Sequence, residues 1–174
     1  LRDFSLIQTP PEARRSIRTF IARHDEHLIR EAITRELDRG GQAYYVYNRV
    51  EGLYERAALL TRLIPGIRVG VVHGQLSETE LEKTMLRFVS GEMDVLVATS
   101  IIESGLDISR ANTMLVDRAD LFGLSQLYQI RGRVGRSKER AYCYLLLPNE
   151  ESVSDEAKAR VDVLARHSDL GSGC

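Results

Sequence analysis

Three arginines and two glycines stand within the six positions from residue 131 to 136, which read Arg-Gly-Arg-Val-Gly-Arg. A guanidinium group is a planar fork of N–H donors that can pair with two phosphate oxygens at once. Each glycine costs about 1 kcal/mol in a helix and needs a reason such as close approach of another group. If the helix indicated by the apolar spacing of residues 124–128 extends this far, Arg133 and Arg136 project from one face. The segment predicts a phosphate-binding site, and the plainer interpretation is a basic surface turn.

A second polar segment begins where a buried strand is expected to end. Residues 95–99 read Val-Leu-Val-Ala-Thr, which is typical of a buried strand, and residues 100–108 add serines, a glutamate, a glycine and an aspartate. Thr99 and Ser100 are therefore expected at the carboxyl end of a strand, the edge where ligands bind in open α/β sheets. Either side chain could instead cap the next turn.

Strand and helix patterns alternate along most of the chain. Strands separated by helices imply an α/β fold in which helices cover both faces of a parallel β-sheet. Residues 1–22 contain two prolines and no clear periodicity, and we interpret them as a linker from a preceding domain. We expect strands at 43–48, 67–72, 95–99, 112–116 and 141–147, and helices at 24–39, 51–63, 77–90, 123–131 and 154–166.

Composition narrows the class of protein. A chain of 174 residues suits one domain, and 24 basic against 25 acidic residues exclude a polycation that binds nucleic acid by bulk attraction. Two cysteines make neither a disulfide framework nor a metal-ligand cluster, so we expect no metal site in this chain. No apolar run approaches a membrane span, and a cytoplasmic location without a membrane partner is expected.

The polar segments together resemble motifs V and VI of the second RecA-like lobe of superfamily-two helicases and translocases. Residues 45–48, Tyr-Val-Tyr-Asn, fit motif IV. Further segments are similar to the RecG-like branch, and within it to the family of bacterial transcription-repair-coupling factors: 2–5, 9–11, 72–75, 101–108, 118–124 and 131–137. The resemblance covers essentially the whole chain and implies a RecA-like parallel sheet with helices on both faces, the helicase C-terminal domain, over residues 23–150.

The resemblance also implies how nucleotide is handled. ATP and magnesium would be bound mainly by a first lobe, because this chain has no Gly-x-x-x-x-Gly-Lys-Ser/Thr loop and no acidic box that follows a strand. We therefore expect the isolated chain to hydrolyse no ATP. The role of Arg131 is left open between a salt bridge within the domain and a phosphate contact. The nucleotide-facing candidates are the arginine fingers Arg133 and Arg136, and Gln129, Gly105, Asp107 and Glu103.

Contacts with double-stranded DNA are implied for a second set of residues. Backbone contacts of this kind carry no sequence information, so tracking without base preference is expected. The last helix resembles the start of a translocation motif over residues 151–174, although an ordinary exposed helix face explains its charges about as well. The DNA-facing candidates are Asn48, His73, Gly74, Thr99, Ser100 and Arg160.

Three functions are compatible with these residues. The favoured one is half of an ATP-dependent double-stranded DNA translocase that displaces stalled RNA polymerase and engages excision-repair proteins through other domains. The order of the motifs at the carboxyl edge of the sheet favours such a motor. A RecG-type fork-regressing helicase and a non-catalytic nucleic-acid or protein-binding module are the alternatives, because fold by itself does not separate them. The chain starts at Leu1 without a methionine, which suggests a piece of a longer protein.

Overall fold

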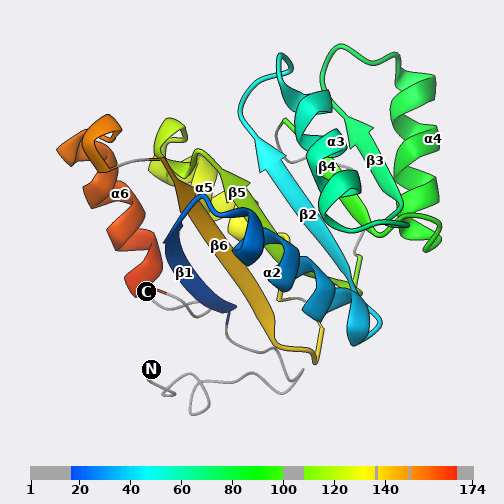
Figure 1. The fold of residues 1–174 in the computed structure, drawn as a ribbon, viewed down its shortest axis with the longest axis horizontal. Coiled ribbons are helices and arrows are strands. Elements are labelled where there is room, and N and C mark those ends of the chain that lie inside the picture. The colour runs from blue at the N-terminus through cyan, green and yellow to red at the C-terminus, as the bar shows by residue number, and fades with distance from the viewer. Residues whose placement is uncertain (1–16, 100–107, 136, 149, 168–174) are drawn as a thin grey trace.

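The computed structural model describes residues 17–99, 108–135, 137–148 and 150–167. Within them six parallel strands form one sheet in the order β1-β6-β5-β2-β4-β3 (Figure 1). The predicted α/β fold is confirmed. The strands are β1 (Ile17–Arg23), β2 (Gln42–Tyr47), β3 (Val69–Val72), β4 (Val95–Ala98), β5 (Ala111–Asp117) and β6 (Ala141–Leu147), and the helices are α2 (Glu26–Asp38), α3 (Leu53–Leu63), α4 (Glu78–Val89), α5 (Leu124–Arg131) and α6 (Asp155–Arg166), with short 3-10 turns η1 (Ala119–Leu121) and η2 (Glu150–Ser152).

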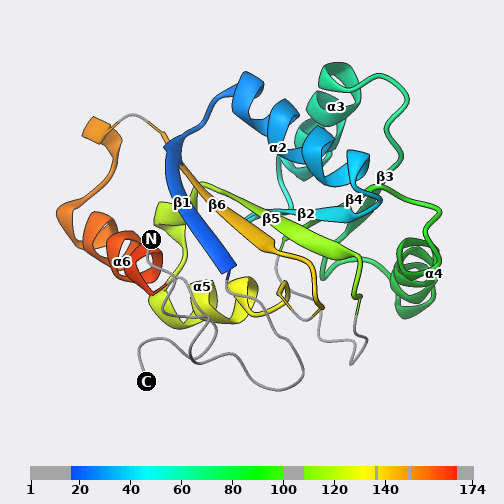
Figure 2. The same cartoon turned by 90° about the horizontal axis from the view of Figure 1, so that it is seen from below.

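Helices cover both faces of the sheet. Helices α2 and α3 lie on one face, and α4, α5 and α6 lie on the other (Figure 2). Each face has its own apolar core, one built around Ile33 and Leu60 and the other around Phe88 and Leu127. The central strands β2, β4 and β5 are buried on both sides, which explains their nearly continuous apolar sequences.

The helices begin where short polar side chains satisfy their first amides. The hydroxyl of Ser77 accepts from the amide of Glu80 at 3.1 Å, and that of Ser154 accepts from Ala157 at 3.1 Å. The carboxylate of Asp25 accepts from the amide of His27 at 2.9 Å before α2. Acidic residues in the first turns of these helices interact favourably with the helix dipole. This interaction explains their positions without a bound metal.

The predicted linker is wrong for residues 17–22, which belong to the edge strand β1. This strand pairs in parallel with β6 along its whole length. Only Ile17 is fully buried, whereas Phe20 and Ile21 are more than one third exposed. A half-covered edge strand lacks the strict alternation by which strands are recognised in a sequence.

The final helix packs onto the same sheet as the rest of the lobe. Val161 and Leu164 join the core that contains Ile17 and Cys143. The described part of residues 151–174 is therefore continuous with the lobe, and its role as the start of a translocation motif stays a prediction. No helix in the described part of the chain is both long and apolar enough to span a bilayer.

Candidate functional site

The arginine segment forms a turn and does not continue the helix. Helix α5 ends at Arg131, and the amides of Arg133 and Val134 bond back by three residues, to Ile130 and Arg131 at 3.1 and 3.2 Å. The condition for Arg133 and Arg136 to share one helix face is therefore not met, because the helix ends at Arg131, before either of them. Arg136 itself lies outside the described residues.

Gly135 shows why this turn needs glycine. Its φ is +82°, a left-handed conformation that side chains disfavour. A Cβ at this position would also lie 2.8 Å from Cγ1 of Ile17 in β1. The expectation of close approach is confirmed at Gly135, and it ties the arginine turn to the edge strand.

The turn separates two arginines that have the same chemistry. Arg131 is 5% exposed, and its guanidinium donates to the carbonyl of Leu164 at 2.8 Å and to Oγ1 of Thr19 at 3.3 Å. It also lies 5.3 Å from the centre of the Tyr128 ring. Arg133 is half-buried, and its guanidinium makes no hydrogen bond or ion pair to any other described residue. Arg131 thus joins α5 to α6 and to β1, whereas Arg133 has no such partner among the described residues.

The arginine turn lies at the amino end of β5, not at the carboxyl edge of the sheet. Gly135 donates to Oδ1 of Asn112 at 3.3 Å, and Asn112 is the second residue of β5. The placement of all the motifs at the carboxyl edge is therefore wrong for this one. Helix α5 follows β5 and must return along the sheet, which carries its last residues back to the end where β5 began.

The segment between β4 and β5 connects the two ends of the sheet. Because these strands are parallel, residues 99–110 start at the carboxyl end of β4 and finish at the amino end of β5. Ser100, Glu103, Gly105 and Asp107 lie outside the described residues. Gln129 is exposed on α5.

At the carboxyl edge the DNA-facing candidates follow neighbouring strands. Asn48, one residue beyond β2, is exposed, and its amide donates to the carbonyl of Leu121 at 3.1 Å. Thr99 follows β4 and is half-buried. Gly74 is exposed, and nothing lies within 4 Å of the position that a Cβ would take. The structure therefore gathers these three residues at one edge of the sheet, where the chain backbone is accessible.

His73 is held in place by its neighbours. Its ring is 6% exposed, and Nδ1 accepts from the amide of Gln75 at 3.2 Å. Nε2 lies 3.0 Å from the hydroxyl of Tyr54, whose ring packs edge-on against the imidazole and is 55% exposed. Because Nδ1 is an acceptor, neutral His73 carries its proton on Nε2 and donates to Tyr54. The Tyr54 hydroxyl then accepts this bond and keeps its own proton for another acceptor, a role that no pattern in the sequence indicated.

A buried carboxylate organises the end of β5 and was also missed. Asp117 is 2% exposed and accepts from the hydroxyl of Tyr45 at 2.8 Å and from Nε of Arg56 at 2.9 Å. The Arg56 guanidinium lies 3.6 Å from the centre of the Tyr47 ring and donates to the carbonyl of Gly52. Burial, and then the Asp117 charge, raise the pKa of Tyr45 above its usual value. The cluster fixes the loop that carries Asn48.

Arg160 points toward the protein. Its guanidinium donates to the carbonyls of Phe122 at 3.2 Å and Asp120 at 3.0 Å, beside η1. The DNA contact expected of Arg160 remains a prediction, and the described contacts join α6 to the carboxyl end of β5. Among the described residues no group of three or more histidine, cysteine, aspartate or glutamate side chains is arranged to hold a metal.

Comparison with known proteins places this lobe in a class. The family model of the helicase conserved C-terminal domain matches residues 24–138. The structure of RecG bound to a three-way DNA junction superposes with a TM-score of 0.79 and 37% identity over 92% of this chain and 21% of RecG. A DEAD box protein from Methanococcus jannaschii shares the fold, with a TM-score of 0.64 and 19% identity over 86% of this chain and 40% of that one. The chain belongs to the helicase C-terminal domain family and forms the second RecA-like lobe of a superfamily-two helicase.

Sequence relatives identify the particular kind of helicase. The transcription-repair-coupling factor of Myxococcus xanthus is 54% identical over 173 residues, which are 99% of this chain and 14% of that protein. The transcription-repair-coupling factor of Staphylococcus aureus is 46% identical over 99% of this chain and 15% of its own length. The chain is therefore homologous to one lobe of these factors and spans about one seventh of their length.

Proposed function

We propose that this chain is the second motor lobe of an ATP-dependent double-stranded DNA translocase. The observation that supports it best is the contrast between the two arginines of the turn. Arg131 is committed to contacts inside the lobe, whereas the Arg133 guanidinium has no partner among the described residues. Two residues after Arg133, the amide of Gly135 donates to Asn112 at the amino end of β5. A guanidinium that no described carboxylate neutralises suits the charge that develops on a γ-phosphate.

ATP and magnesium would be bound jointly by this lobe and by a first motor lobe. The lobe offers guanidinium donors for phosphate oxygens, and a first lobe would supply the phosphate-cradling loop and the acidic ligands for the metal. In this arrangement Arg133 and Arg136 reach the γ-phosphate across the cleft and Gln129 approaches the nucleotide from α5. Glu103, Gly105 and Asp107 complete the set of nucleotide-binding residues that the family resemblance implies. Removing a finger of this kind costs about 10³–10⁵ in rate, which corresponds to roughly 4–7 kcal/mol of barrier.

The DNA grip belongs at the opposite end of the sheet. Asn48, Gly74 and Thr99 lie there, Ser100 follows Thr99 in sequence, and Tyr54 extends the reach of the buried His73. The seven residues of β5 at about 3.3 Å each put roughly 20 Å between the two ends. The segment from Thr99 to Arg110 connects them, so a change at the nucleotide can be passed to the DNA contacts.

The task of the whole protein follows from its relatives. Transcription-repair-coupling factors are 46–54% identical to this chain. We propose that the parent acts in the cytoplasm, displaces stalled RNA polymerase from duplex DNA and engages excision-repair proteins through domains beyond this lobe. Fork regression of the RecG type is the competing function, because RecG has the same fold and 37% identity.

The test compares the full-length parent with its Arg133→Ala and Arg136→Ala variants. DNA-stimulated ATP hydrolysis and displacement of a stalled polymerase should fall by about 10³-fold or more, while binding to duplex DNA without nucleotide is retained. The isolated chain should hydrolyse no ATP. Full hydrolysis by either arginine variant, or robust hydrolysis by the isolated chain, contradicts the proposal. A parent that regresses forks but leaves stalled polymerase in place favours the RecG-type function.

A further inference from the structure

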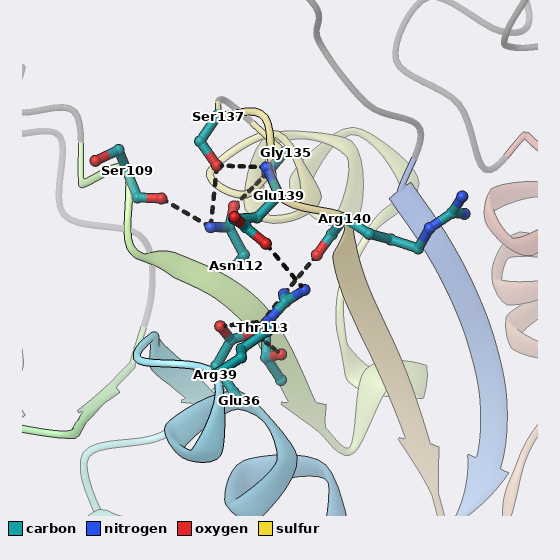
Figure 3. A network of polar contacts seen from close by, with 9 residues as sticks. All are labelled: Glu36, Arg39, Ser109, Asn112, Thr113, Gly135, Ser137, Glu139 and Arg140. Carbon is teal, nitrogen blue, oxygen red and sulfur yellow. Dashed lines mark hydrogen bonds and ion pairs between the residues drawn. The ribbon is translucent and has the colours of Figure 1, made fainter.

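The arginine turn is held by a polar network that neither the family resemblance nor the comparisons assign (Figure 3). At its centre is Asn112, whose side chain is 1% exposed at the amino end of β5. Its Oδ1 accepts from the amide of Gly135 at 3.3 Å, and its Nδ2 donates to Oγ of Ser137 at 3.2 Å and to the carbonyl of Ser109 at 2.7 Å. One buried amide thus joins two segments that are more than twenty residues apart in sequence.

These two segments carry the nucleotide-facing candidates. Gly135 and Ser137 flank Arg136 in sequence, and Gly135 is two residues from Arg133. Ser109 follows Asp107 by two residues. The Asn112 side chain therefore links the arginine turn to the residues that directly precede β5.

A second contact holds the far end of the turn. Arg39, after α2, donates to the carbonyl of Arg140 and lies 3.8 Å from the carboxylate of Glu139. The buried carboxylate of Glu36 accepts from the Arg39 guanidinium at 2.8 and 2.9 Å and from the hydroxyl of Thr113 in β5. Arg39 is thus oriented through Glu36 by the sheet, and it holds Glu139 and Arg140 close to the end of α2.

We propose that Asn112 is a positioning residue for ATP hydrolysis, which holds the Arg133 turn against the end of the segment that precedes β5. This inference rests on the proposed function. Asn112 is buried and has three partners within the protein, so it acts through the turn and does not touch nucleotide. Small misplacements of a catalytic group of about 1 Å cost roughly 10²-fold in rate, which sets the expected scale.

The chain offers a matched control in Gln42. This amide is 3% exposed near the amino end of the adjacent strand β2, and its Nε2 donates to the carbonyls of Phe88 and Met93 at 2.7 and 2.8 Å. It links a different loop at the same end of the sheet. Gln42→Ala therefore removes a comparable buried amide without touching the arginine turn.

The experiment measures DNA-stimulated ATP hydrolysis by the full-length parent. Asn112→Ala should lower kcat by roughly 10–100-fold with little change in KM for ATP, whereas Gln42→Ala should retain kcat even when its melting temperature falls as much. In an Arg133→Ala background the further loss caused by Asn112→Ala should shrink, because the group that it positions is gone. Equal kcat values for Asn112→Ala and Gln42→Ala, or the same loss in both backgrounds, overturn the inference.

The proposed function and the positioning role of Asn112 fail under different results. If Asn112→Ala does not fold, Asn112→Asp replaces it, because this variant keeps the acceptor for Gly135 and loses the donor to Ser109. A lowered kcat at unchanged KM then supports the positioning role, whereas a normal kcat opposes it. Normal hydrolysis by Arg133→Ala refutes the proposed function. An inactive Arg133→Ala together with a fully active Asn112→Ala refutes the positioning role alone.

Discussion

Replacement of Arg131 by methionine should destabilise the lobe, because the guanidinium is a structural group. The change keeps most of the aliphatic packing and removes the donor to the carbonyl of Leu164 at 2.8 Å and to Oγ1 of Thr19 at 3.3 Å. Leu164 is fully buried, so its carbonyl has little access to replacement water. Hydrogen bonds from charged donors contribute about 1.5–3 kcal/mol, and a buried acceptor left without a partner costs about 1–3 kcal/mol.

The free energy of unfolding should therefore fall by about 3 kcal/mol. For a chain of this size 1 kcal/mol corresponds to about 2–4 °C, so the melting temperature should drop by roughly 6–12 °C. Thermal and urea unfolding followed by circular dichroism measure the loss, and hydrogen exchange should show faster opening of α6 than of β5. Arg133→Met, the same substitution in the same turn, is the control and should leave the melting temperature unchanged. If Arg131→Met unfolds like the native chain but abolishes hydrolysis in the parent, the assignment of Arg131 to structure is wrong.

Three further predictions follow from single contacts. Tyr54→Phe removes the hydroxyl beside His73 and should weaken binding of duplex DNA to the parent by roughly fivefold, about 1 kcal/mol. An unchanged affinity, measured by fluorescence anisotropy, would show that Tyr54 only supports His73. Gly135→Ala should lower the free energy of unfolding by about 1–3 kcal/mol, because the φ of Gly135 is +82° and a Cβ there would lie 2.8 Å from Ile17. A urea midpoint equal to that of the native chain would contradict this. Burial raises the pKa of the Cys143 thiol to about 12, so Cys143 should resist alkylation at pH 8 until urea unfolds the chain. The neutral thiol of Cys143 contributes to the free energy of unfolding in full below the unfolded thiol pKa of about 8.5. This contribution should be lost as the pH rises toward 12.

Most of the elements were predictable because their signals are local. The apolar spacing of α4 and the cap at Ser77 depend only on residues within a few positions of each other, and β6 was predicted with its observed ends, Ala141–Leu147. The strand β1 was not predictable in this way. It is defined by pairing with β6, more than one hundred residues later, and as an edge strand it buries little of its own surface.

The candidate site was predictable in its residues but not in their roles. The arginine-glycine spacing indicated phosphate binding, and motif likeness indicated which lobe carries it. The sequence put Arg133 and Arg136 on a common helix face only if the helix extended to them, and it ends at Arg131. The expectation that every motif lies at one edge of the sheet was wrong for the arginine turn. Asn112 and Tyr54 gave no signal, since an asparagine at the start of a strand and a tyrosine at the start of a helix are both ordinary.

By itself, the sequence determined the class of fold, the order of its elements and the chemistry available at each loop, because periodicity, caps and side-chain type are properties of neighbouring residues. Only the tertiary structure decided which of two similar arginines is buried against α6 and which has no partner among the described residues. It also decided that the arginine turn and the loops that carry Asn48, Gly74 and Thr99 stand at opposite ends of the sheet. These outcomes depend on partners such as Leu164 and Thr19, which are distant in sequence and meet Arg131 only when the helices pack onto the strands.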